Sequence, residues 1–191
     1  MMQSSEESPL LSGEKVLLDA VRRDDLPISA KWTGDLDITY HLWTAAVKPI
    51  TLEDEQEWFD NRDQYADTTY TFHIRTILDK QLIGQVGLSH YDARNRTAQL
   101  GIAIGIRDEQ NKGYGTEAVR LIIDYGFREM NLNRIELAVS PFNPRAIHVY
   151  EKTGFTHEGV KRQALYRDGR YHDVIVMAML RDEWRHFRSN E

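Results

Sequence analysis

The sequence contains no cysteine among its 191 residues, and it also lacks long apolar runs. Without cysteine there is no disulfide, no thiolate metal site and no acyl intermediate on a cysteine. An apolar run near the carboxyl end, residues 174–180, is far shorter than the ~20 residues of a membrane-spanning helix. The first dozen residues are rich in Ser and Glu and carry no apolar signal region. We therefore expect no export and a cytoplasmic location.

The chain also lacks an excess of basic residues, since 24 Lys and Arg stand against 30 Asp and Glu, for a formal net charge of −6. Nucleic-acid binders depend on cations that neutralise phosphates, so this balance argues against that class of protein. An excess of carboxylates suits a cationic partner such as an amine. The length suits a single domain, and 41% hydrophobic residues are enough to form its core.

The expected elements alternate in a way that indicates one α+β domain. Strands are expected at residues 14–21, 70–78, 82–91, 97–106, 134–140, 155–161 and 171–180. Asp79 and Lys80 form a tight link between the second and third strands, which predicts an antiparallel hairpin. The order predicts a mixed, mostly antiparallel sheet of about seven strands flanked by helices. We expect the domain to span residues 13–185, with flexible tails at 1–12 and 186–191.

Local signals mark where the expected helices begin and end. Thr51 opens a capping-box pattern. Apolar residues recur at helical spacing over residues 113–130, which predicts a long helix. Asn143 is a good cap and Pro144 a good first helical residue, and Gly154 is a natural end for the short helix between them.

Two glycines, Gly113 and Gly115, lie between an expected strand and the long helix. Glycine lets the backbone approach a ligand closely because it has no Cβ. The free N–H groups of a helix's first turn and the helix dipole both favour an anion there. The segment therefore predicts a site for a phosphate or pyrophosphate. The alternative is that the glycines only shape the connection between strand and helix.

Two other phosphate-binding motifs were compared with this loop. A P-loop requires a lysine after its last glycine, but Thr116 follows Gly115 directly. A Rossmann fingerprint fits Gly113, Gly115 and Ala118, with Glu136 about 20 residues further on. However, Glu136 lies inside an expected strand rather than at its end, and too few residues follow it for the remaining βα units. The Rossmann interpretation is therefore a distant second.

With Gln110 included, the loop reads Gln-x-x-Gly-x-Gly, and the chain resembles the GNAT acetyltransferases. The resemblance continues through Asn143, Tyr150 and residues 152–155. Residues 168–173 are similar to the branch that contains ribosomal-protein N-terminal acetyltransferases and spermidine acetyltransferases. The motifs cover the C-terminal half, whereas the N-terminal half matches in element order only. The resemblance implies a GNAT fold and direct transfer of acetyl from acetyl-CoA to a primary amine in a ternary complex.

The resemblance also implies which residues bind acetyl-CoA. The pantetheine arm and the acetyl carbonyl are expected to meet the backbone of the strand before the loop, at Ile104, Gly105 and Ile106. The backbone amides expected to bind the pyrophosphate are those of Gln110, Asn111, Lys112, Gly113, Tyr114, Gly115 and Thr116. Asn143 matches a side chain that contacts the cofactor arm.

Tyr150 matches the tyrosine proposed in this family to protonate the departing thiolate. A phenol with a pKa of about 10 can deliver that proton. The alternative is that Tyr150 only packs as an aromatic residue of its short helix.

Gln99 stands where a glutamate is common, and an amide cannot accept the ammonium proton. The base therefore stays open between another carboxylate, a chain of waters and an amine that arrives deprotonated. Arg107 stands where many relatives have proline, which predicts a loop of different stiffness.

The sequence thus predicts an N-acetyltransferase whose partners are acetyl-CoA and an amine acceptor, with no nucleic acid and no membrane. Whether two copies form a homodimer stays open. The acceptor is a protein N-terminus, a polyamine or another small amine. None of the seven histidines forms a His-x-x-x-His pair, so no metal is expected. A non-catalytic acyl-CoA-binding module is the alternative from another class, and a missing or blocked acceptor pocket would indicate it.

Overall fold

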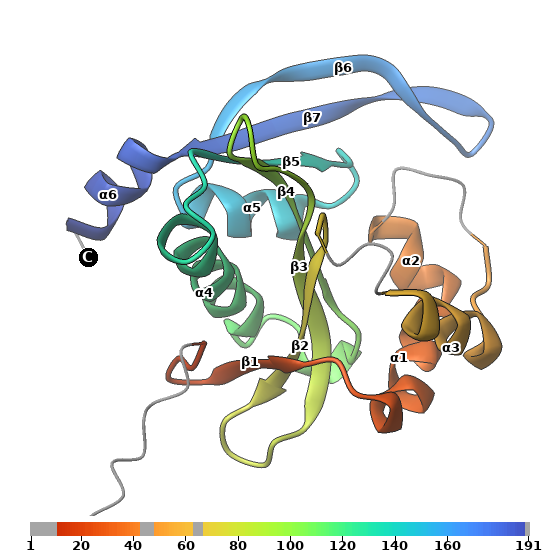
Figure 1. Cartoon of the computed structure of the whole chain (residues 1–191). Coiled ribbons are helices and arrows are strands. Elements are labelled where there is room, and N and C mark those ends of the chain that lie inside the picture. The colour runs from red at the N-terminus through yellow and green to blue at the C-terminus, as the bar shows by residue number, and fades with distance from the viewer. Residues whose placement is uncertain (1–10, 43–47, 63–66, 190–191) are drawn as a thin grey trace, which may run out of the picture.

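The centre of the computed structural model is a mixed sheet, and the structure describes residues 11–42, 48–62 and 67–189 (Figure 1). In these parts of the chain the sheet has seven strands in the order β1-β2-β3-β4-β5-β7-β6. The strands are β1 (Val16–Ala20), β2 (Tyr70–Thr76), β3 (Leu82–Asp92), β4 (Thr97–Ile104), β5 (Arg134–Val139), β6 (Thr156–Arg167) and β7 (Arg170–Leu180). The helices are η1 (Arg23–Asp25), α1 (Leu26–Thr33), α2 (Leu36–Leu42), α3 (Leu52–Asn61), η3 (Arg107–Glu109), α4 (Tyr114–Arg128), α5 (Pro144–Lys152) and α6 (Arg181–Ser189).

The β4–β5 pair is parallel, and the other strand pairs in the described sheet are antiparallel. The predicted α+β fold with a mixed, mostly antiparallel sheet is therefore confirmed. A single β4-α4-β5 unit between antiparallel neighbours excludes the Rossmann interpretation, because that fold is built from successive parallel units.

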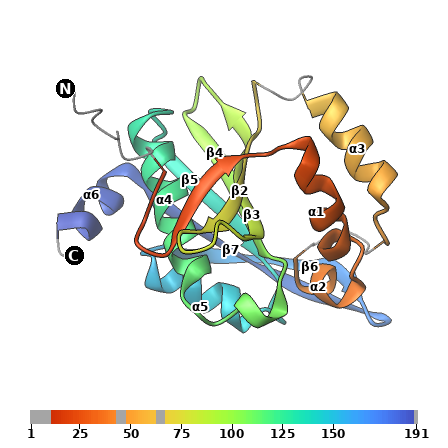
Figure 2. The same cartoon turned by 90° about the horizontal axis from the view of Figure 1, so that it is seen from below.

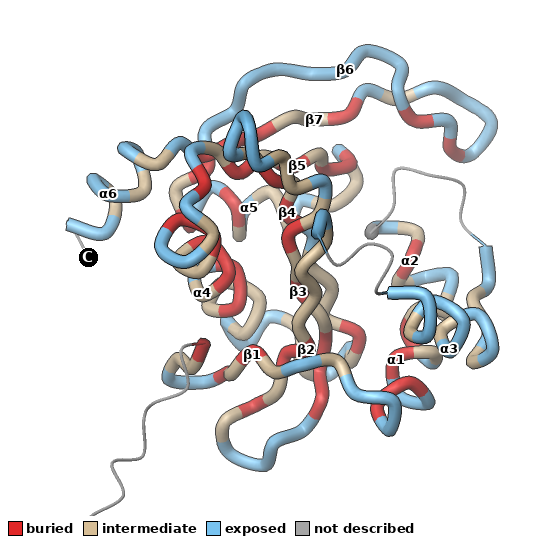
Figure 3. Tube along the Cα trace, in the orientation of Figure 1, coloured by how far each residue is buried: buried red, intermediate tan, exposed pale blue. Residues whose placement is uncertain are grey.

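Helices lie on both sides of the sheet (Figures 1 and 2). On one side α4 packs against the strands, and its buried residues recur at helical spacing, as Ala118, Ile122 and Phe127 show. Figure 3 shows buried stretches along α4 where the helix faces the strands. They join the strand residues of the main core, such as Ile74 and Ile135. Helices α1 to α3 lie on the other side of the sheet from α4 (Figure 2).

Both ends of the domain extend further than the sequence predicted. Leu11, assigned to the N-terminal tail, is buried in the core, and its carbonyl accepts the Leu18 N–H at 2.8 Å. At the other end, the expected tail at 186–191 overlaps helix α6 through residue 189. Trp184 anchors α6 by stacking on Phe127, with ring centroids 5.3 Å apart. The apolar contacts of Leu11 and Trp184 order these segments. Residues 1–10 and 190–191 lie outside the described residues.

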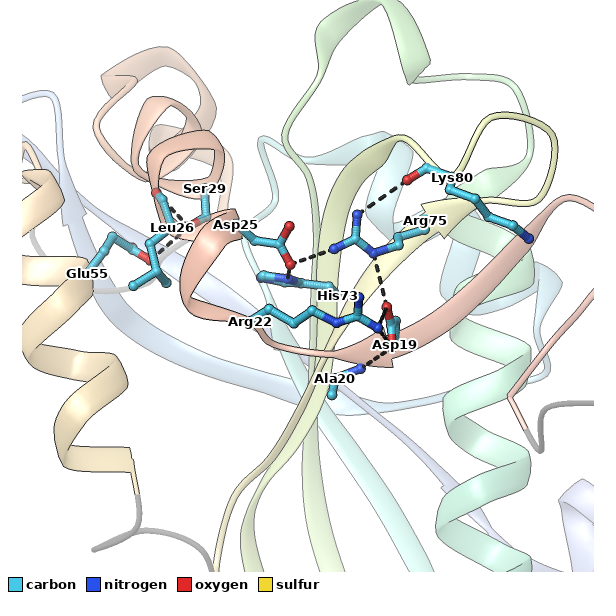
Figure 4. Close-up of polar contacts among 10 residues, drawn as sticks. All are labelled: Asp19, Ala20, Arg22, Asp25, Leu26, Ser29, Glu55, His73, Arg75 and Lys80. Atoms are coloured by element: carbon cyan, nitrogen blue, oxygen red, sulfur yellow. Dashed lines mark hydrogen bonds and ion pairs between the residues drawn. The ribbon is translucent and has the colours of Figure 1, made fainter.

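A buried polar network fastens the start of α1 to β2 (Figure 4). The Asp25 carboxylate lies 3.0 Å from His73 Nδ1 and accepts a hydrogen bond from Arg75 Nη2 at 2.5 Å. Burial lowers the pKa of His73, so this histidine is neutral near pH 7 and donates its Nδ1–H to Asp25. Burial alone would raise the pKa of Asp25, but the hydrogen bonds from Arg75 and His73 lower it. An ionised Asp25 thus holds α1 in place, and with it Trp32 near the other end of the helix.

Glu117 ties the N-terminal segment to the first turn of α4. Its carboxylate accepts three backbone hydrogen bonds, from the N–H groups of Glu14 at 2.6 Å, Lys15 at 2.9 Å and Val16 at 2.9 Å. When a backbone N–H loses a charged acceptor and water replaces that acceptor incompletely, the free energy of unfolding falls by about 1–3 kcal/mol for each N–H. This carboxylate therefore fixes the position of β1 relative to the glycine loop that precedes α4.

Replacing Glu117 with alanine is expected to lower the free energy of unfolding by about 2–4 kcal/mol, because three backbone donors lose one charged acceptor. Chemical denaturation measures this change. Glu129→Ala is the matched control, since Glu129 is exposed at the other end of α4 and should change stability by less than about 0.5 kcal/mol. Equal stability of the two variants would show that the three hydrogen bonds contribute nothing net.

Candidate functional site

Strands β4 and β5 diverge toward their C-terminal ends. They pair only at residues 97–99 with residues 134–136, although β4 continues to Ile104 and β5 to Val139. The β4 edge that faces β5 is therefore left unpaired by β5 from residue 100 onward. Strands that separate in this way present backbone donors and acceptors to a ligand between them.

Alternation along β4 decides which backbone groups face the divergence. The Gly105 N–H donates to the Ile83 carbonyl of β3 at 2.8 Å. Because successive residues direct their groups to opposite sides, those of Ile104 and Ile102 point toward β5. The Ile104 carbonyl accepts a hydrogen bond from Gln110 Nε2 at 3.1 Å. Of the predicted strand residues, Ile104 lies on the diverging edge, whereas the Gly105 N–H is used inside the sheet. Ile102 was not among the predicted site residues, although the two-residue alternation of a β-strand would have identified it.

Trp32 of α1 packs against the backbone just after the end of β4. A Cβ on Gly105 would lie 2.0 Å from Trp32 Cδ2, so the indole rests directly on this glycine. The next residue, Ile106, uses its carbonyl to accept the Glu109 N–H in η3 at 3.0 Å. Gly105 and Ile106 therefore shape the turn from β4 into the glycine loop.

The glycine loop presents free backbone N–H groups at the start of α4. Asn111 and Gly113 both have positive φ, +64° and +87°, and turns of this kind aim successive N–H groups at one point. No described residue accepts a hydrogen bond from the N–H groups of residues 111–115. The dipole of α4 adds positive potential at the same point. The loop thus has the geometry to accept an anion of the size of a pyrophosphate.

Gly115 leaves room for such an anion. A Cβ at this position would meet only Ile104 Cγ1, at an ordinary contact distance of 3.8 Å. Nothing in the protein itself therefore requires glycine there, and close approach of a ligand is the physical reason that remains.

A hollow of about 450 Å³ begins beside this loop and extends along α4. Gly113 and Thr116 line it at the loop. The charged residues that line it are the cations Lys15, Arg120, Lys152 and Arg188 and the carboxylates Glu14, Glu117 and Asp124. The Lys15 ammonium also donates to the Lys112 carbonyl at 3.2 Å. These cations complement the negative charge of phosphate groups. No signal in the sequence links Lys15 to the loop, because the two lie far apart along the chain.

Gln110 holds the loop against its neighbours. Its Oε1 accepts a hydrogen bond from Arg145 Nη1 of α5 at 2.8 Å, while its Nε2 donates to β4. The Gln110 N–H donates to the Arg107 carbonyl at 3.1 Å. Gln110 therefore acts through its side chain, and its amide is already paired within the turn.

Asn143 joins two helices. Its Oδ1 accepts the Ala146 N–H at 3.1 Å, which confirms it as the cap of α5. Its Nδ2 donates to the His41 carbonyl of α2 at 3.1 Å. The predicted contact with the cofactor arm would use the remaining hydrogen of Nδ2.

Tyr150 of α5 is buried, with 6% of its surface exposed, and packs edge-on against Phe155. Its hydroxyl bonds to no described residue, and among the described residues no fully buried side-chain oxygen or nitrogen lacks a partner. The hydroxyl oxygen therefore keeps a small exposed surface. Burial raises the pKa of Tyr150 well above its ordinary value, so the phenol keeps its proton. The proton is therefore available for transfer, while the raised pKa makes the phenol a weaker acid.

Gln99 lies at the last paired position before the strands diverge, opposite Glu136 of β5. Arg134 donates to the Glu136 carboxylate from Nε at 3.2 Å and from Nη2 at 3.0 Å. Glu136 is therefore ion-paired, and it does not supply the free carboxylate that a glutamate at position 99 would provide.

The diverging parallel strands, the anion-binding loop at the start of α4 and the capped α5 define the class of acyl-CoA-dependent N-acyltransferases. The family model described as the acetyltransferase (GNAT) domain matches residues 15–156. The chain belongs to the GNAT acetyltransferase family, as its loop motif predicted.

Known proteins of this family are similar to the chain over most of its length. Bacillus subtilis YdaF, provisionally described as a ribosomal N-acetyltransferase, is 35% identical over 65% of this chain and 67% of its own. A spermidine N(1)-acetyltransferase of Vibrio cholerae is 29% identical over 89% of this chain and 95% of its own. The crystal structure of a Vibrio cholerae spermidine N-acetyltransferase with CoA and spermine has a TM-score of 0.82 at 27% identity, covering 91% of this chain and 99% of that one.

Proposed function

We propose that the protein is an acetyl-CoA-dependent N-acetyltransferase that transfers acetyl directly to a primary amine. The observation that carries this proposal is the set of free N–H groups at residues 111–115, placed beside the β4 edge that β5 leaves unpaired. The relative whose crystal structure holds CoA and spermine has the same fold, which supports both substrates.

Acetyl-CoA supplies the activated thioester. The loop N–H groups and the cations beside them hold its pyrophosphate, and the Ile102 and Ile104 backbone groups align its arm. The amine nitrogen then attacks the acetyl carbonyl carbon, so that a C–N bond forms and the C–S bond breaks. The attacking amine is neutral, its ammonium proton having gone to solvent or to a base outside the residues assigned above. Tyr150 gives its phenolic proton to the leaving sulfur, and the nitrogen loses one more proton as the amide forms. A proton from solvent then restores the Tyr150 phenol.

The acceptor is best identified by a direct screen. Spermidine and spermine come first, because the similar crystal structure contains spermine, and peptides with free N-termini come second. Release of the CoA thiol from acetyl-CoA reports turnover with each amine. Turnover with none of them, together with intact acetyl-CoA binding, would instead support the non-catalytic binding module.

Steady-state kinetics are expected to show a ternary complex, with double-reciprocal lines that intersect. The physical reason is that the chain has no cysteine and no serine in a nucleophile elbow to carry an acetyl group. Mass spectrometry after incubation with acetyl-CoA alone is the complementary measurement. Parallel lines, or a stoichiometric acetylated protein formed before the amine is added, would contradict direct transfer.

Other predictions stay open at this point. No described helix combines the length and the apolar character needed to cross a bilayer. Within the described residues, His, Asp and Glu side chains form no group of three that is arranged to hold a metal ion. The cytoplasmic location, the homodimer, and the lack of nucleic-acid, membrane and metal partners all stay predictions from the sequence.

A further inference from the structure

A row of three directly paired residues crosses the sheet at the point where β4 and β5 separate. Ser89 of β3 lies opposite Gln99 of β4, and Gln99 lies opposite Glu136 of β5. Ala98 and Ile135, which precede Gln99 and Glu136, are buried in the main core with α4. Because side chains alternate along a strand, the three side chains of the row point to the other face of the sheet.

The row lies where the proposed function brings the thioester. The glycine loop for the pyrophosphate follows the end of β4, so the arm of acetyl-CoA runs back along the unpaired edge of that strand. Its acyl end therefore comes toward Gln99, the last residue of β4 that pairs with β5. Side chains of the row are thus placed beside the amine nitrogen that attacks the acetyl carbon.

Ser89 is the member of the row that is neither an amide nor part of an ion pair. The Gln99 amide cannot accept a proton from an ammonium group. The Glu136 carboxylate is held by Arg134 at 3.2 and 3.0 Å. Residues directly opposite each other in antiparallel strands have Cβ atoms about 5 Å apart, so Ser89 reaches nearly the same space as Gln99. A serine hydroxyl, however, needs a second group that receives the proton it passes on.

His90 supplies that second group, from an irregular point of β3. The pairing with β4 shifts between Ser89 and Asp92, and His90 has φ +53°, in the left-handed region. Neighbouring side chains of a regular strand point to opposite faces, whereas a bulge re-aims a side chain. Here His90 Nδ1 lies 3.1 Å from Ser89 Oγ. The bulge therefore brings an imidazole to the hydroxyl at the separating strands.

The two side chains connect the row to bulk water. The Ser89 hydroxyl lies 3.1 Å from His90 Nδ1 and 3.4 Å from the Gln99 carbonyl, so its one hydrogen has an acceptor on either side. Ser89 is half-buried and His90 is exposed. Imidazole is the side chain that takes up and releases protons between about pH 5 and 8. An exposed imidazole can therefore pass a proton from the hydroxyl to solvent.

The elements beside His90 carry charged groups before β2, in β3 and the turn after it, and in β5: Asp67, Asp92, Arg94, Arg96, Arg134 and Glu136. The hydrogen bonds from Asn95 lower the pKa of Asp92, so this carboxylate stays ionised and engaged in its turn. Among the described residues, Ser89 is the side chain that hydrogen-bonds to the His90 ring. His90 therefore exchanges protons with Ser89 and with solvent.

Open space lies next to the row on the same face. Gly101, two residues after Gln99, is exposed, and a Cβ there would meet nothing within 4 Å. Gly87 lies directly opposite Gly101 on β3. Because neither residue has a side chain, an amine nitrogen can approach the Ser89 hydroxyl across this pair.

We propose that Ser89 and His90 together accept the proton that the ammonium group of the amine substrate must lose before attack. This inference rests on the proposed function. The ammonium nitrogen gives a proton to Ser89 Oγ while the Ser89 hydroxyl gives its own proton to His90 Nδ1. One proton thus moves from nitrogen to imidazole, and the serine is regenerated. The nitrogen keeps the lone pair that attacks the acetyl carbon, and the imidazole releases the proton to solvent.

The test measures kcat/KM for the amine against pH, at saturating acetyl-CoA, in wild type, Ser89→Ala and His90→Asn. Asparagine tolerates a left-handed backbone, but its amide takes up no proton. At about pH 7 both variants should lose about 100-fold, the lower end of a general-base contribution. The loss should shrink to about threefold near pH 9.5, because an alkylamine with a pKa of about 10.4 then supplies its own neutral form.

Two further variants separate proton transfer from a change in structure. His157→Asn is the matched control, because His157 is also exposed and its ring bonds to one neighbouring side chain, Glu151, at 2.9 Å. Its pH profile should equal that of wild type. Ser89→Thr keeps the hydroxyl on a residue that suits a strand, so kcat/KM at about pH 7 should return to within about threefold of wild type. The acetyl-CoA Kd and the melting temperature should change little in all of these variants.

The proposal is overturned if either Ser89→Ala or His90→Asn keeps the wild-type kcat/KM at about pH 7. A loss of the same size at about pH 7 and pH 9.5 would also overturn it, because disturbed structure lowers activity at both values. A wild-type protein that acetylates no amine would instead remove the proposed function, and this proposal with it. The wild-type measurement therefore distinguishes the two failures.

Discussion

Replacing Gly115 with valine is expected to reduce the affinity for acetyl-CoA by about 100-fold or more while the melting temperature stays close to that of wild type. The affinity falls because the new side chain occupies the space in which the loop N–H groups reach the pyrophosphate, and hydrogen bonds to a charged group are each worth about 1.5–3 kcal/mol. The fold tolerates the change, since a Cβ at Gly115 meets only Ile104 Cγ1 at 3.8 Å. Valine is also no worse than glycine in a helix.

Calorimetric titration with acetyl-CoA measures this effect. Gly113→Ala provides the contrast, because Gly113 has φ +87° and a Cβ there costs about 1–2 kcal/mol of backbone strain. That variant should lose both affinity and stability, whereas Gly115→Val should lose affinity alone. Undiminished affinity in Gly115→Val would show that the pyrophosphate does not bind at this loop.

Replacing Tyr150 with phenylalanine is expected to lower kcat by about 100-fold, the usual size of a general-acid contribution. Phenylalanine keeps the ring that packs against Phe155 and removes only the hydroxyl. That hydroxyl bonds to no described residue, so the melting temperature and the acetyl-CoA Kd should change little. A pure packing role predicts the opposite result, with near-normal turnover for phenylalanine and a loss of stability for alanine.

Tyr125→Phe is the matched control, because Tyr125 is a partly buried tyrosine of α4 whose ring packs edge-on against Phe72. Its kcat should match wild type. Since burial raises the pKa of Tyr150 above its ordinary value of about 10, the wild-type kcat should show no alkaline limb from this group below about pH 10. A Tyr150→Phe enzyme within about twofold of wild type, with chemistry limiting the rate, would refute the acid role.

The class of fold and the glycine loop were predictable because both depend on residues that are neighbours in the sequence. The long helix at 113–130 has a helical period that the structure confirms as α4 (Tyr114–Arg128). The Asn143 cap and the Gly113 turn are likewise local features. Local signals of this kind report backbone conformation directly, because caps, turns and periods act within one or two helical turns.

The short helix α2 was not predicted, and its sequence shows why. Residues 36–42 include the β-branched Ile38 and Thr39 and no strong helix period. The helix exists because Arg107, Asn143 and Arg167 satisfy its two ends from distant parts of the chain. Propensity is a weak prior in such a case, since tertiary contacts decide the outcome.

The sequence by itself determined the family, and it predicted the loop for an anion and the candidate acid. Each of these depends on a short motif whose chemistry needs those residue types at that spacing. Tertiary structure alone decided that Lys15 lies beside the loop, that the Gly105 N–H is used by Ile83, and that α2 joins the ends of β4 and β5. These features depend on pairing register and on side chains that meet across 70 to 127 residues of chain. A pattern read along the sequence carries no information about such meetings, because they form only when the sheet brings distant segments together.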